Sequence, residues 1–99
     1  MMAAPLSLAD SVAISEDVVF REITGEMVLL DLSSGTYFGL NETGTRIWTL
    51  LQHGGSLRHV FDVARAEYDV LPEDFERDLL GLVRELCARD LARVATPQR

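Results

Sequence analysis

The residues best suited to chemistry in this sequence are His53, His59, Cys87 and the acidic pair Glu73 and Asp74. Nucleophilic catalysis needs a nucleophile beside a base that is itself oriented by a third group. The two histidines fall on separate predicted helices and the cysteine falls on an apolar helix face. The acids stand in the first turn of a helix, where they complement the helix dipole. These positions indicate structural roles, so we expect no enzyme.

The same residue types argue against bound cofactors. Two histidines and one cysteine are too few for a closed zinc site, and a lone cysteine cannot form an internal disulfide. No glycine pattern of the phosphate-binding kind follows a predicted strand. We therefore expect neither a metal nor another cofactor.

Composition and charge narrow the functional classes further. The chain has 99 residues, enough for one small domain, and its nine basic residues are all arginines that oppose sixteen acidic residues, for a formal charge of -7. Such a surface repels nucleic-acid phosphates and anionic lipid. No apolar run is long enough to span a bilayer, and the start shows no basic targeting segment. We expect a cytoplasmic protein that binds neither nucleic acid nor membrane.

Three short runs rich in β-branched and aromatic residues predict strands at residues 18–23, 27–32 and 36–40. The loops between them contain glycine, so neighbouring strands should pair as hairpins. The expected result is a three-stranded antiparallel meander.

After the third strand the apolar period changes from two to about 3.6, which predicts helices. We expect them at residues 42–53, 57–68 and 72–90. Asn41 stands at the N-cap of the first helix, and Trp48 lies on its inner face, so both are predicted to be structural.

The third helix carries a wide apolar arc of about 160°, more than the roughly 100° that one core face requires. Its predicted inner stripe consists of Phe75, Leu79, Leu82 and Leu86. A shoulder on one side consists of Leu80, Val83 and Cys87. This helix is therefore expected to face two partners.

The order of three strands and three helices predicts an α+β fold in a winged-helix-like arrangement, with the domain at residues 18–94. Residues 1–17 are predicted to be an N-terminal tail and residues 95–99 a C-terminal tail. Val12 and Ile14 could add a short extended piece to the first of these. Near the other end the chain is predicted to fray from about residue 92, although Leu91 and Val94 could fold back onto the core.

The third strand is an outer strand without charge or proline, and a bare edge of this kind is a template for another chain. Gly39 leaves space for another backbone. If the shoulder of the third helix lies beside this edge, the two form a groove for an extended peptide. Two other coverings remain open, namely a second copy of the chain and the N-terminal segment pairing through Val12 and Ile14.

Several of these residues resemble a known family. Residues 35–41, with the sequence GTYFGLN, are followed by Gly44 and Ile47-Trp48, then by a Gly-Ser helix start, Tyr68, Pro72 and a long last helix. This pattern is similar to the coenzyme PQQ synthesis protein D (PqqD-like) family over about residues 18–94. The segment from Tyr37 to Asn41 with Ile47-Trp48 is the most specific part.

The resemblance implies a non-catalytic recognition element that binds the leader segment of a ribosomally made precursor peptide. In such elements the leader adds as a strand beside the third strand, against the last helix, and is presented to a modifying enzyme. That enzyme would be a radical SAM protein, a leader peptidase and cyclase of a lasso-peptide pathway, or a kinase. The implied peptide-binding residues are Thr36, Tyr37, Phe38, Gly39, Leu40, Leu80, Val83, Arg84 and Cys87.

Two positions depart from the family pattern. Leu71 stands before Pro72 where members often have a capping Asp or Ser, and Asp90 stands where many have glycine. Both concern the ends of the third helix and leave the predicted groove unchanged.

Two alternatives from other functional classes remain. One is a winged-helix DNA-binding regulator, which the acidic residues of the third helix and the lack of lysine oppose. The other is a homodimeric structural partner that closes the open strand edge on itself.

Overall fold

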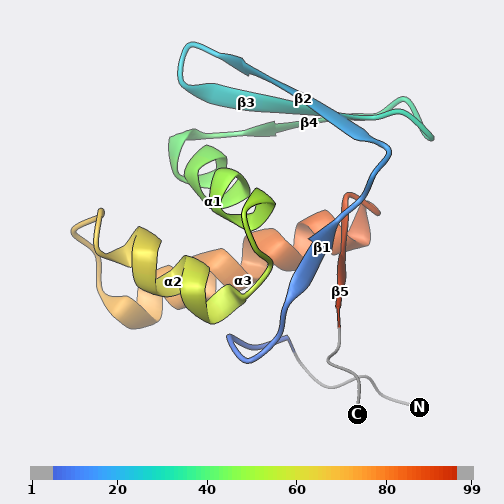
Figure 1. Cartoon of the computed structure of the whole chain (residues 1–99). Coiled ribbons are helices and arrows are strands. Elements are labelled where there is room, and N and C mark those ends of the chain that lie inside the picture. Colours follow the sequence, from blue (N-terminus) through green and yellow to red (C-terminus); the bar gives the residue numbers. More distant parts are fainter. Residues whose placement is uncertain (1–5, 96–99) are drawn as a thin grey trace.

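The computed structural model describes residues 6–95 and confirms the α+β fold (Figure 1). A three-stranded antiparallel sheet in the order β2-β3-β4 is followed by three helices, and β1 and β5 form a separate two-stranded ribbon. The elements are β1 (Val12–Ile14), β2 (Val18–Ile23), β3 (Glu26–Asp31), β4 (Tyr37–Leu40), α1 (Glu42–Gln52), α2 (Leu57–Arg65), α3 (Pro72–Ala88) and β5 (Ala92–Val94). The parts of the predicted tails at residues 1–5 and 96–99 lie outside the described residues.

The first hairpin of the sheet is tight. Ile23 of β2 pairs with Glu26 of β3, which leaves Thr24 and Gly25 as the only turn residues. Both have a positive φ, 55° and 82°, the backbone that matches the twist of the two strands in a two-residue hairpin. This turn fixes the register of β3, on which β4 then pairs.

Asp31 organises the turn between β3 and β4. Its carboxylate accepts hydrogen bonds from the hydroxyls of Ser34 and Ser33, each at 2.9 Å, and from the Ser33 N–H at 3.1 Å. Gly35, with φ 76°, donates its N–H to the Asp31 carbonyl at 2.7 Å. The hydrogen bond from Ser34, followed by those from Ser33, lowers the pKa of Asp31 below its ordinary value of 3.8. The turn thereby directs the chain into β4.

The starts of the helices follow the predicted caps. Asn41 Oδ1 accepts a hydrogen bond from the Gly44 N–H at 2.8 Å, which confirms its structural role at the start of α1, and Ser56 caps α2 in the same way. α3 begins after Leu71 without a side-chain cap, with Pro72 in its first turn.

The second and third helices end earlier than the predicted residues 68 and 90. α2 ends at Arg65 and α3 ends at Ala88. Asp90 has a φ of 61°, the left-handed backbone that glycine adopts most easily and that aspartate tolerates better than most residues. The chain then continues into a buried Leu91 and β5, so the predicted fraying from residue 92 is wrong for β5.

Trp48 lies in the core between the sheet and α1, as predicted. It has no exposed surface, and its ring meets the ring of Phe20 edge to face with the centroids 6.2 Å apart. Thr45 ties the same helix to the sheet, because its hydroxyl accepts the Met27 N–H at 2.9 Å. These contacts hold α1 against β2 and β3.

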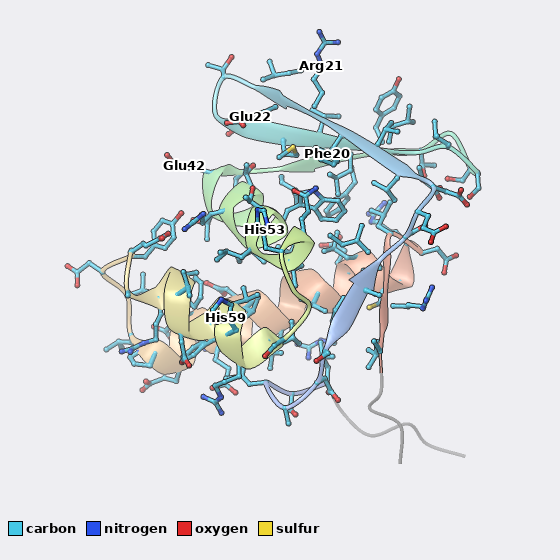
Figure 2. All side chains as sticks on the ribbon, in the orientation of Figure 1. Phe20, Arg21, Glu22, Glu42, His53 and His59 are labelled. Carbon is cyan, nitrogen blue, oxygen red and sulfur yellow. The ribbon has the colours of Figure 1, made fainter. Side chains whose placement is uncertain are left out.

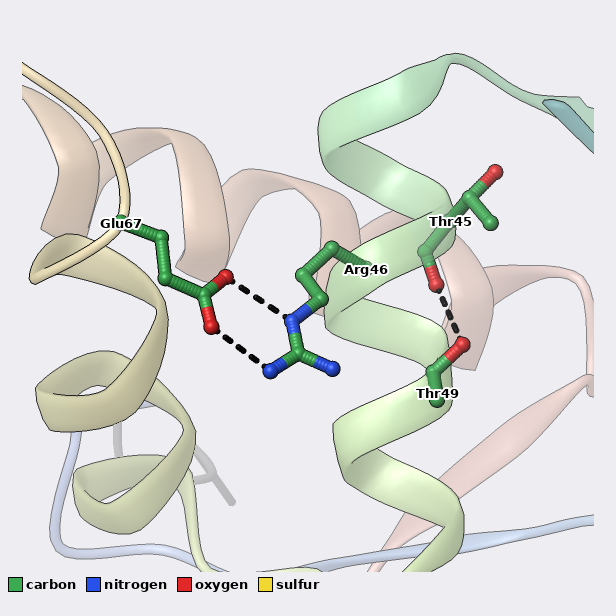
Figure 3. A network of polar contacts seen from close by, with 4 residues as sticks. All are labelled: Thr45, Arg46, Thr49 and Glu67. Atoms are coloured by element: carbon green, nitrogen blue, oxygen red, sulfur yellow. Dashed lines mark hydrogen bonds and ion pairs between the residues drawn. The ribbon is translucent and has the colours of Figure 1, made fainter. Parts of the chain in front are cut away.

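An ion pair fixes α1 relative to the segment that follows α2. Arg46 donates from Nε and Nη2 to the two carboxylate oxygens of Glu67, at 2.9 and 2.7 Å (Figure 3). This hydrogen-bonded pairing lowers the pKa of Glu67 and raises the pKa of Arg46. Figure 3 also shows the Thr49 hydroxyl donating to the Thr45 carbonyl, at 2.9 Å.

Residues 8–14 belong to the fold, which corrects this part of the predicted tail at residues 1–17. Leu8 and Val12 are buried, and β1 pairs antiparallel with β5 so that Val12 faces Val94. A Cβ atom at Gly55 would lie only 1.9 Å from the Val12 carbonyl oxygen, so this close approach requires glycine. The pairing joins opposite ends of the chain, and local periodicity carries no signal for it.

Candidate functional site

β4 is an edge strand whose outer side has no backbone partner among residues 6–95. β3 pairs with its inner side only. The alternative in which Val12 and Ile14 cover this edge is wrong, because both pair with β5. The N-terminal segment therefore does not cover the open edge of β4.

The register decides which backbone groups of β4 face outward. The Asp31 N–H donates to the Thr36 carbonyl at 3.0 Å, and hydrogen-bonded and non-hydrogen-bonded pairs alternate along antiparallel strands. Phe38 is therefore bonded to β3, whereas Tyr37 and Gly39 direct their N–H and C=O groups toward the open edge. These two residues are the positions where an added strand can form its hydrogen bonds.

A groove with a volume of about 350 Å³ lies between β4, the start of α1 and one side of α3. Its lining is mixed, because apolar residues alternate with Asn41 and Thr43 at the start of α1 and with two carboxylates on α3. The residues that line it include Phe38, Gly39, Leu40, Ile47, Asp78, Leu82 and Glu85.

Two glycines shape this groove in different ways. A Cβ atom at Gly44 would lie 3.3 Å from Asn41 Oδ1 and from two atoms of the Leu40 side chain, so the start of α1 packs closely beneath β4. A Cβ atom at Gly39 would meet nothing within 4 Å. The space beside the backbone of Gly39 is thus unoccupied by the described residues.

The four helix residues that the family resemblance implied do not line this groove. Val83 is fully buried, so its side chain is not on the surface, and Arg84 is exposed. Leu80 and Cys87 are partly buried against the core but lie outside the lining. Their role as the helix wall of a peptide site stays a prediction.

The side of α3 that faces β4 carries Asp78, Leu82 and Glu85 instead. At about 100° per residue these positions lie on the opposite edge of the apolar arc from Leu80 and Cys87. Leu82, which the periodicity assigns to the inner stripe, is half-buried, and Val83 takes the buried position. Both edges of the arc carry leucine, so the sequence does not show which edge meets the strand.

Arg89 is a residue of the site that the sequence pattern does not indicate. Its guanidinium carbon lies 4.8 Å from the centroid of the Phe38 ring, a cation–π contact that joins the end of α3 to β4. Its Nη2 also lies 3.5 Å from Glu85 Oε2. The contact depends on where the last turn of α3 lies in space, which no local pattern specifies.

The cysteine and the two histidines, the side chains best suited to catalysis, lie apart from one another in the structure. Burial raises the pKa of the Cys87 thiol, which favours the unreactive protonated form. His53 and His59 are both exposed; His53 follows α1, and His59 lies in α2 (Figure 2). Within residues 6–95 no three side chains of the metal-ligating types come together.

Among the helices of residues 6–95, none combines the length and the apolar character that crossing a bilayer demands.

This α+β fold thus places an open edge strand beside a groove with apolar and acidic walls, which is the arrangement that an added peptide strand requires. The chain belongs to the family of coenzyme PQQ synthesis protein D (PqqD), whose family model matches residues 26–92. The resemblance inferred from the sequence is thereby confirmed.

Two solved structures are similar to nearly the whole chain. One is TbiB1 in complex with the TbiA(beta) leader peptide, with 41% identity, a TM-score of 0.79, and coverage of 86% of this chain and 99% of that chain. The other is lasso peptide synthetase B1 complexed with the leader peptide, with 32% identity, a TM-score of 0.75, and coverage of 84% and 98%. A comparison with curated proteins found no match.

Proposed function

We propose that this chain binds the leader segment of a ribosomally made precursor peptide by adding it as a strand to β4. The observation that carries the proposal is the register of β4, which turns the N–H and C=O groups of Tyr37 and Gly39 toward an edge with no partner among residues 6–95. Similarity to two leader-peptide complexes supports the same occupant. The leader thus lies beside β4 and against the Leu82 side of α3.

The energetics require side-chain contacts as well as strand pairing. About four backbone hydrogen bonds contribute roughly 1 kcal/mol each, which does not exceed the roughly 4 to 15 kcal/mol cost of association. Each apolar side chain that the leader buries adds roughly 1.5 to 3 kcal/mol. Phe38 and Leu82, the partly buried apolar side chains of the groove lining, supply the apolar surface for such anchors. Micromolar binding, about -8 kcal/mol, therefore requires the apolar side chains of the leader to supply most of the net binding free energy.

We infer that the chain is itself non-catalytic and presents the leader to a modifying enzyme. The protonated, partly buried Cys87 and the exposed, separated histidines support a recognition role. Whether the enzyme is a radical SAM protein, a peptidase with a cyclase, or a kinase stays a prediction, as does the cytoplasmic compartment. Asp78 and Glu85 on the exposed side of α3 oppose the DNA-binding alternative.

The test is a calorimetric titration of the full chain with the synthetic leader of the precursor peptide encoded beside its gene. The core segment of the same precursor serves as the control ligand. We expect micromolar binding of the leader and none of the core segment. Equal binding of both segments, or of neither, would contradict leader recognition.

A further inference from the structure

The two ends of the groove differ in charge. At the end near Phe38, Arg89 lies over the aromatic ring and also approaches Glu85, so one positive and one negative group compensate each other. This end offers little net charge to a guest peptide.

The other end carries Asp78, which is exposed and lines the groove. Asp78 precedes Arg89 by about three helical turns, or roughly 16 Å, which is longer than the four-residue strand β4. Since Arg89 lies at Phe38, Asp78 lies toward Leu40, and β4 and α3 run in opposite directions (Figure 1). Asp78 takes part in none of the ion pairs found among residues 6–95.

We infer that the leader carries a lysine or arginine opposite Asp78, two residues away from an apolar side chain that packs on Leu82. The inference rests on the proposed function and names the chemistry of the ligand that the groove selects. A cationic segment also suits a chain with a formal charge of -7.

The spacing follows from the geometry of the two elements. Asp78 and Leu82 are four residues apart on a helix, which separates them by about 6 Å along its axis. Side chains on one face of a strand are two residues and about 6.6 Å apart. Neighbouring groove-facing side chains of the leader therefore match Asp78 and Leu82 in turn.

The direction of the leader follows from the same arrangement. An antiparallel partner of β4 runs from the Leu40 end to the Phe38 end, so it passes Asp78 before it passes Leu82. The basic residue consequently precedes the apolar anchor in the leader sequence. A partner that added in parallel would carry the same two residues in the reverse order.

The experiment measures the affinity of the same synthetic leader for the full-length chain and for four variants. Asp78→Asn and Asp78→Lys alter the groove. Asp62→Asn and Asp62→Lys make the same charge changes at an exposed residue of α2 that does not line it. A second set of leaders replaces each lysine or arginine in turn by glutamine.

We expect Asp78→Asn to weaken binding about three- to fivefold and Asp78→Lys about tenfold or more, whereas the Asp62 variants change it less than about twofold. One glutamine-substituted leader should bind the wild type and Asp78→Asn equally, because its partner charge is gone. If the leader binds but the Asp78 and Asp62 variants behave alike, or if no basic residue couples to Asp78, this inference is wrong and the proposed function stands. If the leader does not bind the wild type at all, both are overturned.

Discussion

The guanidinium of Arg89 lies over the ring of Phe38, 4.8 Å from its centroid. This contact ties the C-cap of α3 to β4, the strand with the open edge. Phe38 is also a β4 residue whose backbone faces β3 in the ladder. The inner side of β4 is therefore held from two directions while its outer side stays free. A strand held in this way is preorganised for a partner, which lowers the ordering cost of association.

Replacement of Gly39 by proline should abolish leader binding and leave the fold largely intact. The Gly39 N–H faces the open edge, so its loss removes no bond to β3, but it removes a donor to the leader and adds a clash. Calorimetry with the leader and circular dichroism of the free variant measure the two effects. Gly39→Ala is the matched control, because it retains the N–H and its Cβ meets no atom within 4 Å. Normal leader binding by Gly39→Pro would move the site elsewhere.

Leu82→Ala should weaken leader binding about tenfold or more, because the apolar contact that it removes from the leader is worth roughly 1.5 to 3 kcal/mol. Leu80→Ala is the comparison, because Leu80 is also a partly buried leucine of α3 but lies outside the groove lining. Its affinity for the leader should stay near that of the wild type. The reverse order of the two effects would restore the wall that the sequence resemblance implied.

Truncation of Trp48 to alanine should lower the free energy of unfolding by roughly 3 to 5 kcal/mol, because the side chain is fully buried at the contact between α1 and the sheet. Chemical denaturation followed by circular dichroism measures the change. A loss below about 1 kcal/mol would mean that Trp48 does not fill the core as described.

Two glycine-to-alanine changes should act in opposite directions on stability. Gly55→Ala forces the Val12 backbone away from the turn between α1 and α2, so it should destabilise the fold and detach β1. Gly81→Ala lies within α3 where a Cβ meets nothing within 4 Å, so it should stabilise by roughly 0.5 to 1 kcal/mol. Thermal unfolding of both variants provides the test, and a stable Gly55→Ala protein would contradict the position of β1.

Asp31 should contribute to stability in a pH-dependent way. Its hydrogen bonds to Ser34 and Ser33 lower its folded pKa below 3.8, so its stabilising effect is complete above that value and is lost as the pH falls through the folded pKa. The Tm of Asp31→Asn should lie below that of the wild type at pH 7, and the gap should narrow below about pH 4. A gap that is the same at both pH values would show that the carboxylate charge does not organise this turn.

Much of the fold follows from local patterns. The β-branched runs, the Thr24-Gly25 turn and the Asn41 cap each act within a few residues, so the sequence alone predicts β2, β3, β4 and the start of α1. The β1–β5 ribbon could not be predicted in this way, because its two strands have three residues each and come from opposite ends of the chain.

The open strand edge was predictable from the sequence, whereas the side of α3 that faces it was not. The uncharged edge of β4 is visible in the sequence as Tyr37 to Leu40, and the structure leaves that edge without a partner among residues 6–95. The helix side depends on the rotation of α3 about its axis, which Leu80 and Leu82 leave undecided because they border the apolar arc on either side. The contact from Arg89 depends on tertiary packing alone.

The most direct test of the account is hydrogen exchange of the backbone amides of β4, measured by nuclear magnetic resonance with and without the leader. Tyr37 and Gly39 should gain strong protection when the leader is added, because their N–H groups then donate to it. Phe38 should show little change, because its N–H already donates to β3. Leader binding that leaves Tyr37 and Gly39 as exposed to exchange as before would contradict the claim that this strand receives the peptide.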